Sequence, residues 1–444
     1  MLELEDIQAL FIAPPRYPFG RYTFVSFDST DAGRAWLAQL VNQIPSAKVG
    51  LDAHASGQVL PSPVYVAFTA TGLRALGVDD TAVSTFAEEF VAGMPARAEI
   101  LGDTGPNSPE HWDGDVASDR LHAAVLLFAS DADALTQRLA ELEAFLAAHP
   151  GVTVLSFIDL AAANMSRPVE HFGYRDRISV VQIEGTGLEP VPGSFPPSKP
   201  GEFVLGYPDD VGVVAALPKP EALSRNGTYL VYRKLQQHVG AFRDFLSQNA
   251  ATPDEQELLA AKMMGRWRSG APLVLAPERD DPLLGEDPLR NNNFNYGQMD
   301  PIGYAAPVGS HIRRVNPRDT ELNVQRHLMV RRGLTYGPAL PEGAEEDGVE
   351  RGLTLLAGCA RINDQFEFVQ QIWVNDTEFM GIKNERDPIT GAQDGTFDMT
   401  IPKKPFKKVI KGLPAFTTVK GGAYLFLPGL RALRHLAGIE QESH

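Results

Sequence analysis

Two periodicities alternate along the first third of the chain and predict strands and helices in turn. Runs rich in aromatic and β-branched residues predict four strands, at residues 21–28, 63–68, 122–129 and 152–158. Apolar residues at helical spacing predict helices at 30–44 and 131–149, which follow the first and third strands. The resulting order, β-α-β-β-α-β, is that of a ferredoxin-like unit.

The last part of the chain resembles the first part. Three strand–helix pairs have counterparts: residues 228–246 resemble 21–40, residues 352–373 resemble 122–148, and residues 423–437 resemble 64–78. The third pair shares the run Gly-Leu-Arg-Ala-Leu. This internal similarity predicts a second related unit, with chance similarity as the alternative. The expected fold class is therefore α+β, with two ferredoxin-like (βαββαβ) units built on antiparallel sheets.

Two irregular stretches divide the chain. Residues 189–203 are rich in proline, which neither continues a helix nor donates to a sheet, and a second irregular region runs from 277 to 310. We predict an N-terminal unit at 1–165, a connecting segment at 166–202 and a C-terminal unit at 203–444. Long loops inside compact domains are often functional, which makes residues 277–310 a place to look for a site.

Composition excludes several classes of function. The 444-residue chain has a formal net charge of −16, which argues against non-specific nucleic-acid binding because such binding needs a basic surface. No apolar run is long enough to span a membrane, and the acidic N-terminus does not have the pattern of a secretory signal. Cys359 is the only cysteine, so no disulfide can form within the chain. A cytoplasmic location is the simplest expectation, although a protein exported after folding would share these features.

The motif search leaves two candidate segments, residues 309–319 and residues 329–337 (MVRRGLTYG). The histidines form neither HExxH nor a close pair with zinc-ligand spacing, and the chain contains no Walker A sequence and no GxSxG elbow. The sequence alone does not rule out a Ser-His-Asp triad, but no motif in it indicates one. In residues 309–319, GSHIRRVNPRD, His311 stands among several arginines. This segment is either a basic surface turn or the site of an anionic cofactor with a histidine-bound metal. Haem fits, because its iron takes an imidazole and its propionates pair with arginines.

Ten segments in order resemble the dye-decolourising haem peroxidases, in their longer bacterial and fungal branch. They are LEDIQALFI, FAEEFVAGMPARAEILGDTG, HFGYRDRIS, KPGEFVLGYP, NGTYLVYRKLQQ, AAKMMGRWRSGAPLVLAP, GSHIRRVNPRD, MVRRGLTYG, RGLTLLAGCARINDQFEFVQQIWVND and FTTVKGGAYLFLPGLRAL. The resemblance covers almost the whole chain. It implies an enzyme that reduces hydrogen peroxide while it oxidises bulky organic molecules such as dyes or phenolics. It also implies one haem b (iron protoporphyrin IX), held mainly by the C-terminal ferredoxin-like unit.

The resemblance also implies roles for single residues. His311 matches the axial ligand of the haem iron. Asp176 and Arg331 match the catalytic aspartate and arginine of the opposite, distal face, with Arg332 as the alternative to Arg331. The other haem contacts that it implies are Arg318, at a propionate, and Arg313, Leu353, Leu355 and Arg177. Leu353 and Leu355 would share one face of a strand, because side chains alternate with a period of two.

These residue types suit peroxide cleavage. One positioned carboxylate can take a proton from one peroxide oxygen and return it to the other, as base and then as acid. A fixed guanidinium stabilises the negative charge that develops as the O–O bond breaks. An axial imidazole is a better donor when its second nitrogen donates to a carboxylate, for which Asp394 and Asp398 are candidates. Trp373 or Tyr336 could relay electrons from bulky molecules, although a packed aromatic is the plainer interpretation.

The distal loop departs from the family pattern at Arg177. Residues 173–177 read Gly-Tyr-Arg-Asp-Arg, where the family motif ends in glycine, and glycine there usually means a positive φ or a close backbone approach. Asp176, flanked by Arg175 and Arg177, could instead be a solvated surface charge. If the Arg177 guanidinium lies near Asp176, it favours the charged carboxylate; if it turns away, it narrows the pocket. We expect the second arrangement, because a further buried cation beside Arg331 would need counter-charge.

Three functions remain open at this point. The first is an active haem peroxidase. The second is a haem carrier, store or sensor whose peroxidase turnover is weak because of Arg177. The third is a relative that has lost haem, which His311 and its arginines argue against. The sequence does not predict the oligomeric state.

Overall fold

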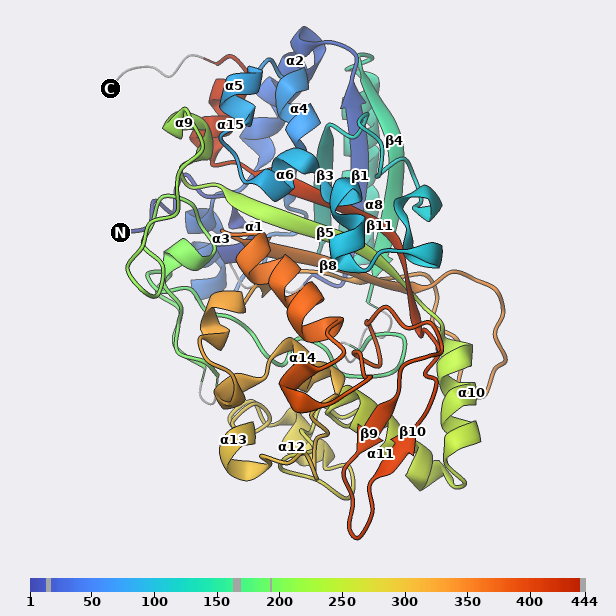
Figure 1. Ribbon diagram of the computed structural model, residues 1–444. Coiled ribbons are helices and arrows are strands. Elements are labelled where there is room, and N and C mark those ends of the chain that lie inside the picture. The colour runs from blue at the N-terminus through green and yellow to red at the C-terminus, as the bar shows by residue number, and fades with distance from the viewer. Residues whose placement is uncertain (13–16, 163–168, 192–193, 440–444) are drawn as a thin grey trace.

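A computed structural model describes residues 1–12, 17–162, 169–191 and 194–439 as an α+β fold (Figure 1). The N-terminal sheet has the strand order β4-β1-β3-β2, with all neighbours antiparallel. Its elements are β1 (Phe19–Phe27), α2 (Thr30–Leu40), β2 (Val64–Phe68), β3 (Ala123–Ala129), α8 (Ala132–Ala147) and β4 (Val152–Ala161). Each predicted strand and helix of this unit is present, so the ferredoxin-like prediction is confirmed here.

Local sequence explains where the two helices begin. The Ser29 hydroxyl accepts from the Ala32 backbone N–H at the start of α2, and the Asp131 carboxylate accepts from Ala134 N at the start of α8. The apolar face of α2 then buries Trp36. Seven shorter helices complete the two units: α1 (Ala9–Ile12), α3 (Ala47–Ala55), α4 (Ala70–Ala75), α5 (Asp80–Val83), α6 (Glu88–Ala92), α7 (Ala98–Leu101) and α9 (Glu221–Ser224).

The C-terminal sheet repeats this arrangement, with strand order β11-β5-β8-β6. Its elements are β5 (Thr228–Gln237), α10 (Val239–Asn249), β6 (Val330–Arg331), β7 (Thr335–Tyr336), β8 (Gly352–Cys359), β11 (Thr417–Leu427) and α15 (Leu430–Leu436). Strand β5 lies between β11 and β8 as β1 lies between β4 and β3, so β11 occupies the place of β4. The similarity of residues 423–437 to 64–78 had suggested the place of β2. That similarity reflects only a local strand–helix pattern, which does not depend on position in the sheet.

The two sheets are joined at one edge and packed face to face. Strands β2 and β11 pair only through Phe68 and Phe426. Elsewhere Tyr232 of β5 packs on Tyr22 and Phe24 of β1, at ring-centroid distances of 6.1 and 5.1 Å. In Figure 1, β1 and β4 stand upright while β5 and β8 run across them. The main hydrophobic core therefore lies between the units and contains residues of both.

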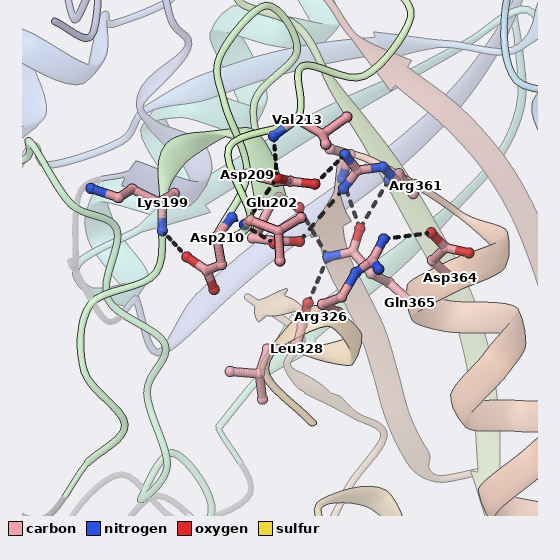
Figure 2. A network of polar contacts seen from close by, with 12 residues as sticks. Lys199, Glu202, Asp209, Asp210, Val213, Arg326, Leu328, Arg361, Asp364 and Gln365 are labelled. Carbon is pink, nitrogen blue, oxygen red and sulfur yellow. Dashed lines mark hydrogen bonds and ion pairs between the residues drawn. The ribbon is translucent and has the colours of Figure 1, made fainter. Parts of the chain in front are cut away.

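A buried polar network joins residues 202–209 to the segment that follows β8 (Figure 2). Arg361 donates to the Asp209 carboxylate at 2.8 Å and lies 3.7 Å from Glu202 Oε2. Gln365 Nε2 donates to the Glu202 and Leu328 carbonyls. Gln365 lies in a π-helical stretch, η8 (Asn363–Glu367) and η9 (Val369–Val374), in which Glu367 N bonds to the carbonyl five residues earlier.

The rest of the C-terminal half consists of short elements and loops. These are α11 (Pro253–Met264), α12 (Pro282–Glu286), α13 (Tyr296–Met299), α14 (His311–Val315) and the hairpin of β9 (Met399–Ile401) and β10 (Lys408–Ile410). The predicted irregular region at 277–310 thus contains only two short helices. No helix in the described ranges is both long and apolar enough to cross a bilayer.

The domain bounds drawn from the sequence stay a prediction. The boundary between 165 and 166 lies outside the described residues. The terminal segments also cross between the units: Gln8 donates to Pro428 O, and Asp6 accepts from the Arg431 backbone. Each unit therefore relies on contacts with the other for part of its packing.

Candidate functional site

A large cavity opens between the two units. It encloses about 1080 Å³ when the open solvent at its mouth is counted. Both units contribute to its wall. Its lining residues are Leu10, Tyr17, Tyr65, Phe128, Asp176, Arg177, Ser179, Val180, Val181, Met329, Val330, Arg331, Arg332, Gly333, Leu334, Leu353, Thr354 and Leu355. Asp176, Arg177, Arg331, Leu353 and Leu355, all predicted from the sequence, therefore meet at one place.

The loop of residues 173–177 carries Asp176 to the cavity wall. Arg177 has a φ of 63°, as expected at a position where glycine is usual, and its backbone N–H donates to Asp176 Oδ1 at 2.6 Å. Arg175 turns elsewhere and donates to Gly285 O. No ion pair joins Asp176 to Arg177 or Arg175 within the described ranges. Asp176 is thus a cavity carboxylate and not a solvated charge between two cations.

Arg331 is the last residue of β6 and Arg332 follows it, and their side chains have different surroundings. Arg332 donates to the Leu10 and Phe11 carbonyls at the end of α1, which ties its guanidinium to the wall. Arg331 lines the cavity and is exposed, and its guanidinium has no hydrogen bond or ion pair with any described residue. Gly333 makes this geometry possible, because a Cβ there would meet Thr354 O at 1.8 Å. The chain passes close against β8 and presents Arg331 to the cavity.

Strand β8 supplies the apolar wall. Leu353 and Leu355 are half-buried and both line the cavity, so they share a face as the strand period requires. Thr354 between them is buried, and its hydroxyl donates to Leu334 O. An apolar wall next to Asp176 and Arg331 lowers the local dielectric and strengthens their electrostatic effect on a bound molecule.

His311 opens helix α14 and is held by a buried carboxylate. Its Nδ1 lies 2.8 Å from Asp387 Oδ2, and Asp387 is fully buried. Burial opposes ionisation of Asp387, but His311 and N–H groups of Thr390 and Ile389 outweigh it and hold the pKa of this carboxyl below its ordinary value. An ionised Asp387 accepts a proton-bearing Nδ1, which leaves the Nε2 lone pair for another atom. The Nε2 has no hydrogen-bond partner in the described part of the chain.

Close packing fixes the orientation of α14. Gly265 ends α11 with a φ of 97°, and a Cβ there would lie 2.5 Å from Ile312 Cγ1. His311 itself is not among the cavity's lining residues. Val308 and Val315, on either side of it, pack in the same apolar cluster as Met329, which does line the cavity. The imidazole itself has one nitrogen fixed by a carboxylate, the arrangement of a metal-ligating histidine. These residues fit a haem.

Two arginines with predicted cofactor roles do not reach the cavity wall. Arg313 is fully buried and donates to Asp300 O and Ala306 O, so it holds the loop at 300–306. Arg318 donates to Asn292 O and Phe294 O and stacks on the Phe294 ring at 3.8 Å. Both of the Arg313 bonds use Nη1, and the buried Nε and Nη2 of Arg313 have no hydrogen-bond partner among the described residues, so its cofactor contact stays a prediction. The predicted propionate contact of Arg318 also stays a prediction. Its guanidinium lies 5.9 Å from the centre of the Phe195 ring, and Phe195 packs against the same apolar cluster as Met329 of the cavity wall.

The predicted partners of His311 were wrong. Asp394 is exposed and accepts from Thr396, and Asp398 accepts from Gly412 N at 3.3 Å. The partner is Asp387, which lies 76 positions from His311. Its signal in the sequence was the Asp-Pro-Ile-Thr turn, in which the other carboxylate oxygen accepts from two following N–H groups.

The two aromatic relay candidates are packed. Trp373 is 3% exposed and packs edge-on against His327 and Phe368. Tyr336 is 5% exposed and lies under the Lys234 ammonium at 4.9 Å. Neither side chain presents a surface to a bulky molecule, and the structure assigns them packing roles.

Comparison with known proteins gives one consistent result. Residues 20–159 match the family model described as the DyP dimeric alpha+beta barrel domain, and residues 209–392 match the one described as Dyp-type peroxidase, C-terminal. A dye-decolorizing peroxidase of Mycena epipterygia is 33% identical over 414 residues, which cover 84% of this chain and 76% of that protein. A crystal structure of DyP has a TM-score of 0.87 at 28% identity and covers 100% of both chains. A dye-decolorizing peroxidase in complex with 2,6-dimethoxyphenol has a TM-score of 0.85 at 27% identity, with 98% of this chain and 100% of its own covered.

Proposed function

The chain belongs to the dye-decolourising peroxidase family, and from that premise we propose that it binds one haem b through His311 and cleaves hydrogen peroxide with Asp176 and Arg331. The observation that carries this proposal is the pairing of residues in the cavity. A carboxylate and a guanidinium, neither in an ion pair with a described residue, line the same partly apolar space. A small molecule bound in this space could therefore contact both charges at once.

His311 would hold the cofactor through its Nε2. Asp387 keeps its proton-bearing Nδ1 in place, so Nε2 is presented as the ligand atom and the imidazole gains basicity. The bound haem supplies the two-electron oxidation–reduction chemistry that amino-acid side chains lack. Non-covalent haem b is favoured over covalently attached haem, because Cys359 is the only cysteine and is buried in β8.

Asp176 and Arg331 would act on the peroxide. The Asp176 carboxylate accepts the proton of the oxygen nearer the cofactor and delivers it to the departing oxygen, which leaves as water. The Arg331 guanidinium stabilises the negative charge that builds on that oxygen until the proton arrives. Arg177 N–H holds Asp176 Oδ1, so the other carboxylate oxygen is the one that exchanges the proton.

The electrons would come from organic donors such as dyes and phenolics. The related structure in complex with 2,6-dimethoxyphenol supports a phenolic donor for this chain. The cytoplasm remains the simplest location, because the chain has one cysteine and needs no oxidising compartment.

The test is the absorption spectrum of the purified protein before and after one equivalent of hydrogen peroxide. We expect a haem spectrum that changes on peroxide addition and is lost or altered in His311→Ala. An unchanged spectrum and haem content in His311→Ala would refute the assignment of the ligand. A wild type that binds haem and barely reacts with peroxide would favour the haem carrier, store or sensor instead.

A further inference from the structure

The loop that carries Asp176 lies along the sheet edge that carries Arg331. We call residues 169–177 the distal loop and residues 330–336 the edge segment, which contains β6 and β7 and pairs with β8. Both line one small space, to which the distal loop contributes Val169, Glu170, Asp176 and Arg177 and the edge segment contributes Gly333, Leu334 and Thr335. The two segments that supply the proposed catalytic pair are therefore neighbours in the fold.

The His171 imidazole joins these two segments directly. Its Nε2 donates to the Tyr336 carbonyl of β7 at 2.8 Å, and the side chain is buried. A carbonyl only accepts, so Nε2 carries the proton and Nδ1 does not. Nδ1 is also buried and has no hydrogen-bond partner among the described residues. An apolar ring would fill this place equally well, so the bond to Tyr336 is the contact that requires a histidine here.

Glu170 makes the distal loop stiff. Its carboxylate accepts from the Phe172 N–H at 2.9 Å and from the Tyr174 N–H at 2.8 Å, and its own backbone N–H donates to Tyr174 O. The same carboxylate accepts from the side-chain amide of Gln237 in β5. Asp176 follows this closed turn after two residues. A shift of the turn relative to the edge segment is therefore passed on to Asp176.

We propose that His171 is a positioning residue that fixes Asp176 relative to Arg331. Its bond to Tyr336 O attaches the stiff turn to the edge segment, so that the carboxylate and the guanidinium are both held against β8. The proposal rests on the proposed function, in which Asp176 exchanges a proton with peroxide and Arg331 stabilises the developing charge. Misplacing such a group by about 1 Å can cost on the order of 10²-fold in rate.

Two substitutions separate the hydrogen bond from the packing. His171→Phe keeps a planar ring of similar size and removes the donor, whereas His171→Gln keeps an N–H donor on a side chain of similar reach. His122→Phe is the matched control, because His122 is half-buried, bonds to the Phe27 N–H at 2.8 Å and lies outside the cavity lining. The readouts for each holoenzyme are the rate of the reaction with peroxide, the haem content and the unfolding free energy. Crystal structures add the position of Asp176, which does not depend on turnover.

The result that carries the proposal is a loss of rate that depends on Asp176. His171→Phe should react about 10–10²-fold more slowly than wild type at unchanged haem content, and His171→Gln should recover most of this loss. In the Asp176→Asn background, where no carboxylate is left to place, His171→Phe should change the remaining rate by less than about twofold. The crystal structure of His171→Phe should show Asp176 displaced from its place beside the edge segment. If His171→Phe does not fold, His171→Met takes its place in the same comparison.

Several outcomes would overturn the proposal. They are a His171→Phe variant as fast as wild type, an equal loss of rate in the Asp176→Asn background, and an equal loss of rate in His122→Phe. Failure of the proposed function looks different, because Asp176→Asn itself would then react as fast as wild type. In that case the crystal structure decides, and an undisplaced Asp176 in His171→Phe overturns the positioning role.

Discussion

Two regions of this molecule bring aspartate and arginine together, and they use the same residue types in opposite ways. At the end of β8, Arg361 is 17% exposed in its side chain and pairs with Asp209 while it approaches Glu202 (Figure 2). In the cavity, Arg331 is exposed and pairs with no described residue, although Asp176 lines the same space. The first arrangement is closed and the second is open.

The contrast shows what separates a structural ion pair from a reactive one. Asp209 also accepts from the Val211 and Val213 N–H groups, so most of its lone pairs are occupied within the protein. Asp176 accepts only from its neighbour Arg177 among the described residues. A carboxylate whose two oxygens are both hydrogen-bonded within the protein can stabilise the fold, but it is not available to exchange a proton with a bound molecule. The predictions below follow from this difference.

The largest expected effect is on the open pair. Arg331→Leu should slow the reaction with hydrogen peroxide by about 10²–10³, the typical cost of losing one fixed donor to a developing charge. Stopped-flow absorbance after mixing with peroxide measures the rate, and the haem content serves as the control because it should not change. If Arg332→Leu is slow and Arg331→Leu is not, the role belongs to the neighbouring residue.

The closed pair should affect stability instead. Asp209→Asn leaves the buried side of Arg361 without its closest counter-charge and should cost roughly 3 kcal/mol of unfolding free energy, the lower end for a broken buried pair. Urea or guanidinium denaturation measures this change. Asp364→Asn is the matched control, because Asp364 forms an exposed pair with Arg326 at 3.7 Å and should contribute less than about 1 kcal/mol. Equal losses in the two variants would contradict the closed arrangement.

A smaller effect should appear in the pH dependence of stability. Burial raises the pKa of Glu202. The backbone N–H of Asp210 donates to Glu202 and lowers this pKa in part, whereas the negative charge of the Asp210 carboxylate raises it further. The folded state then holds a proton that the unfolded state has already lost, so wild-type stability falls as the pH rises above the ordinary range of glutamate. Glu202→Gln has no such proton, so its unfolding free energy relative to wild type should increase from about pH 4 to about pH 8. A constant difference across this range would show that Glu202 titrates normally.

Much of the fold could be predicted because local patterns determine it. The strands β1 to β4 and the helices α2 and α8 follow from periodicity and caps that lie within a few residues of each other. The place of β11 could not be predicted, because strand order depends on long-range pairing. Asp176 and Arg331 were found through their motifs, but the pairing of His311 with Asp387 joins segments 76 positions apart. Arg313 is two positions from His311 and its Nη1 donates to a loop, since residues i and i+2 of a helix do not face the same side.

The central claim is that Asp176 is an open carboxylate that exchanges a proton with peroxide. The most direct test is the rate of the reaction with peroxide for wild type and Asp176→Asn from about pH 3 to about pH 8, with unfolding free energies measured on the same samples. The account predicts a large loss of rate in Asp176→Asn at every pH where the wild type reacts, with little change in stability. If Asp176→Asn reacts as fast as wild type throughout this range, Asp176 is not the base and the distinction between the open and the closed pair fails.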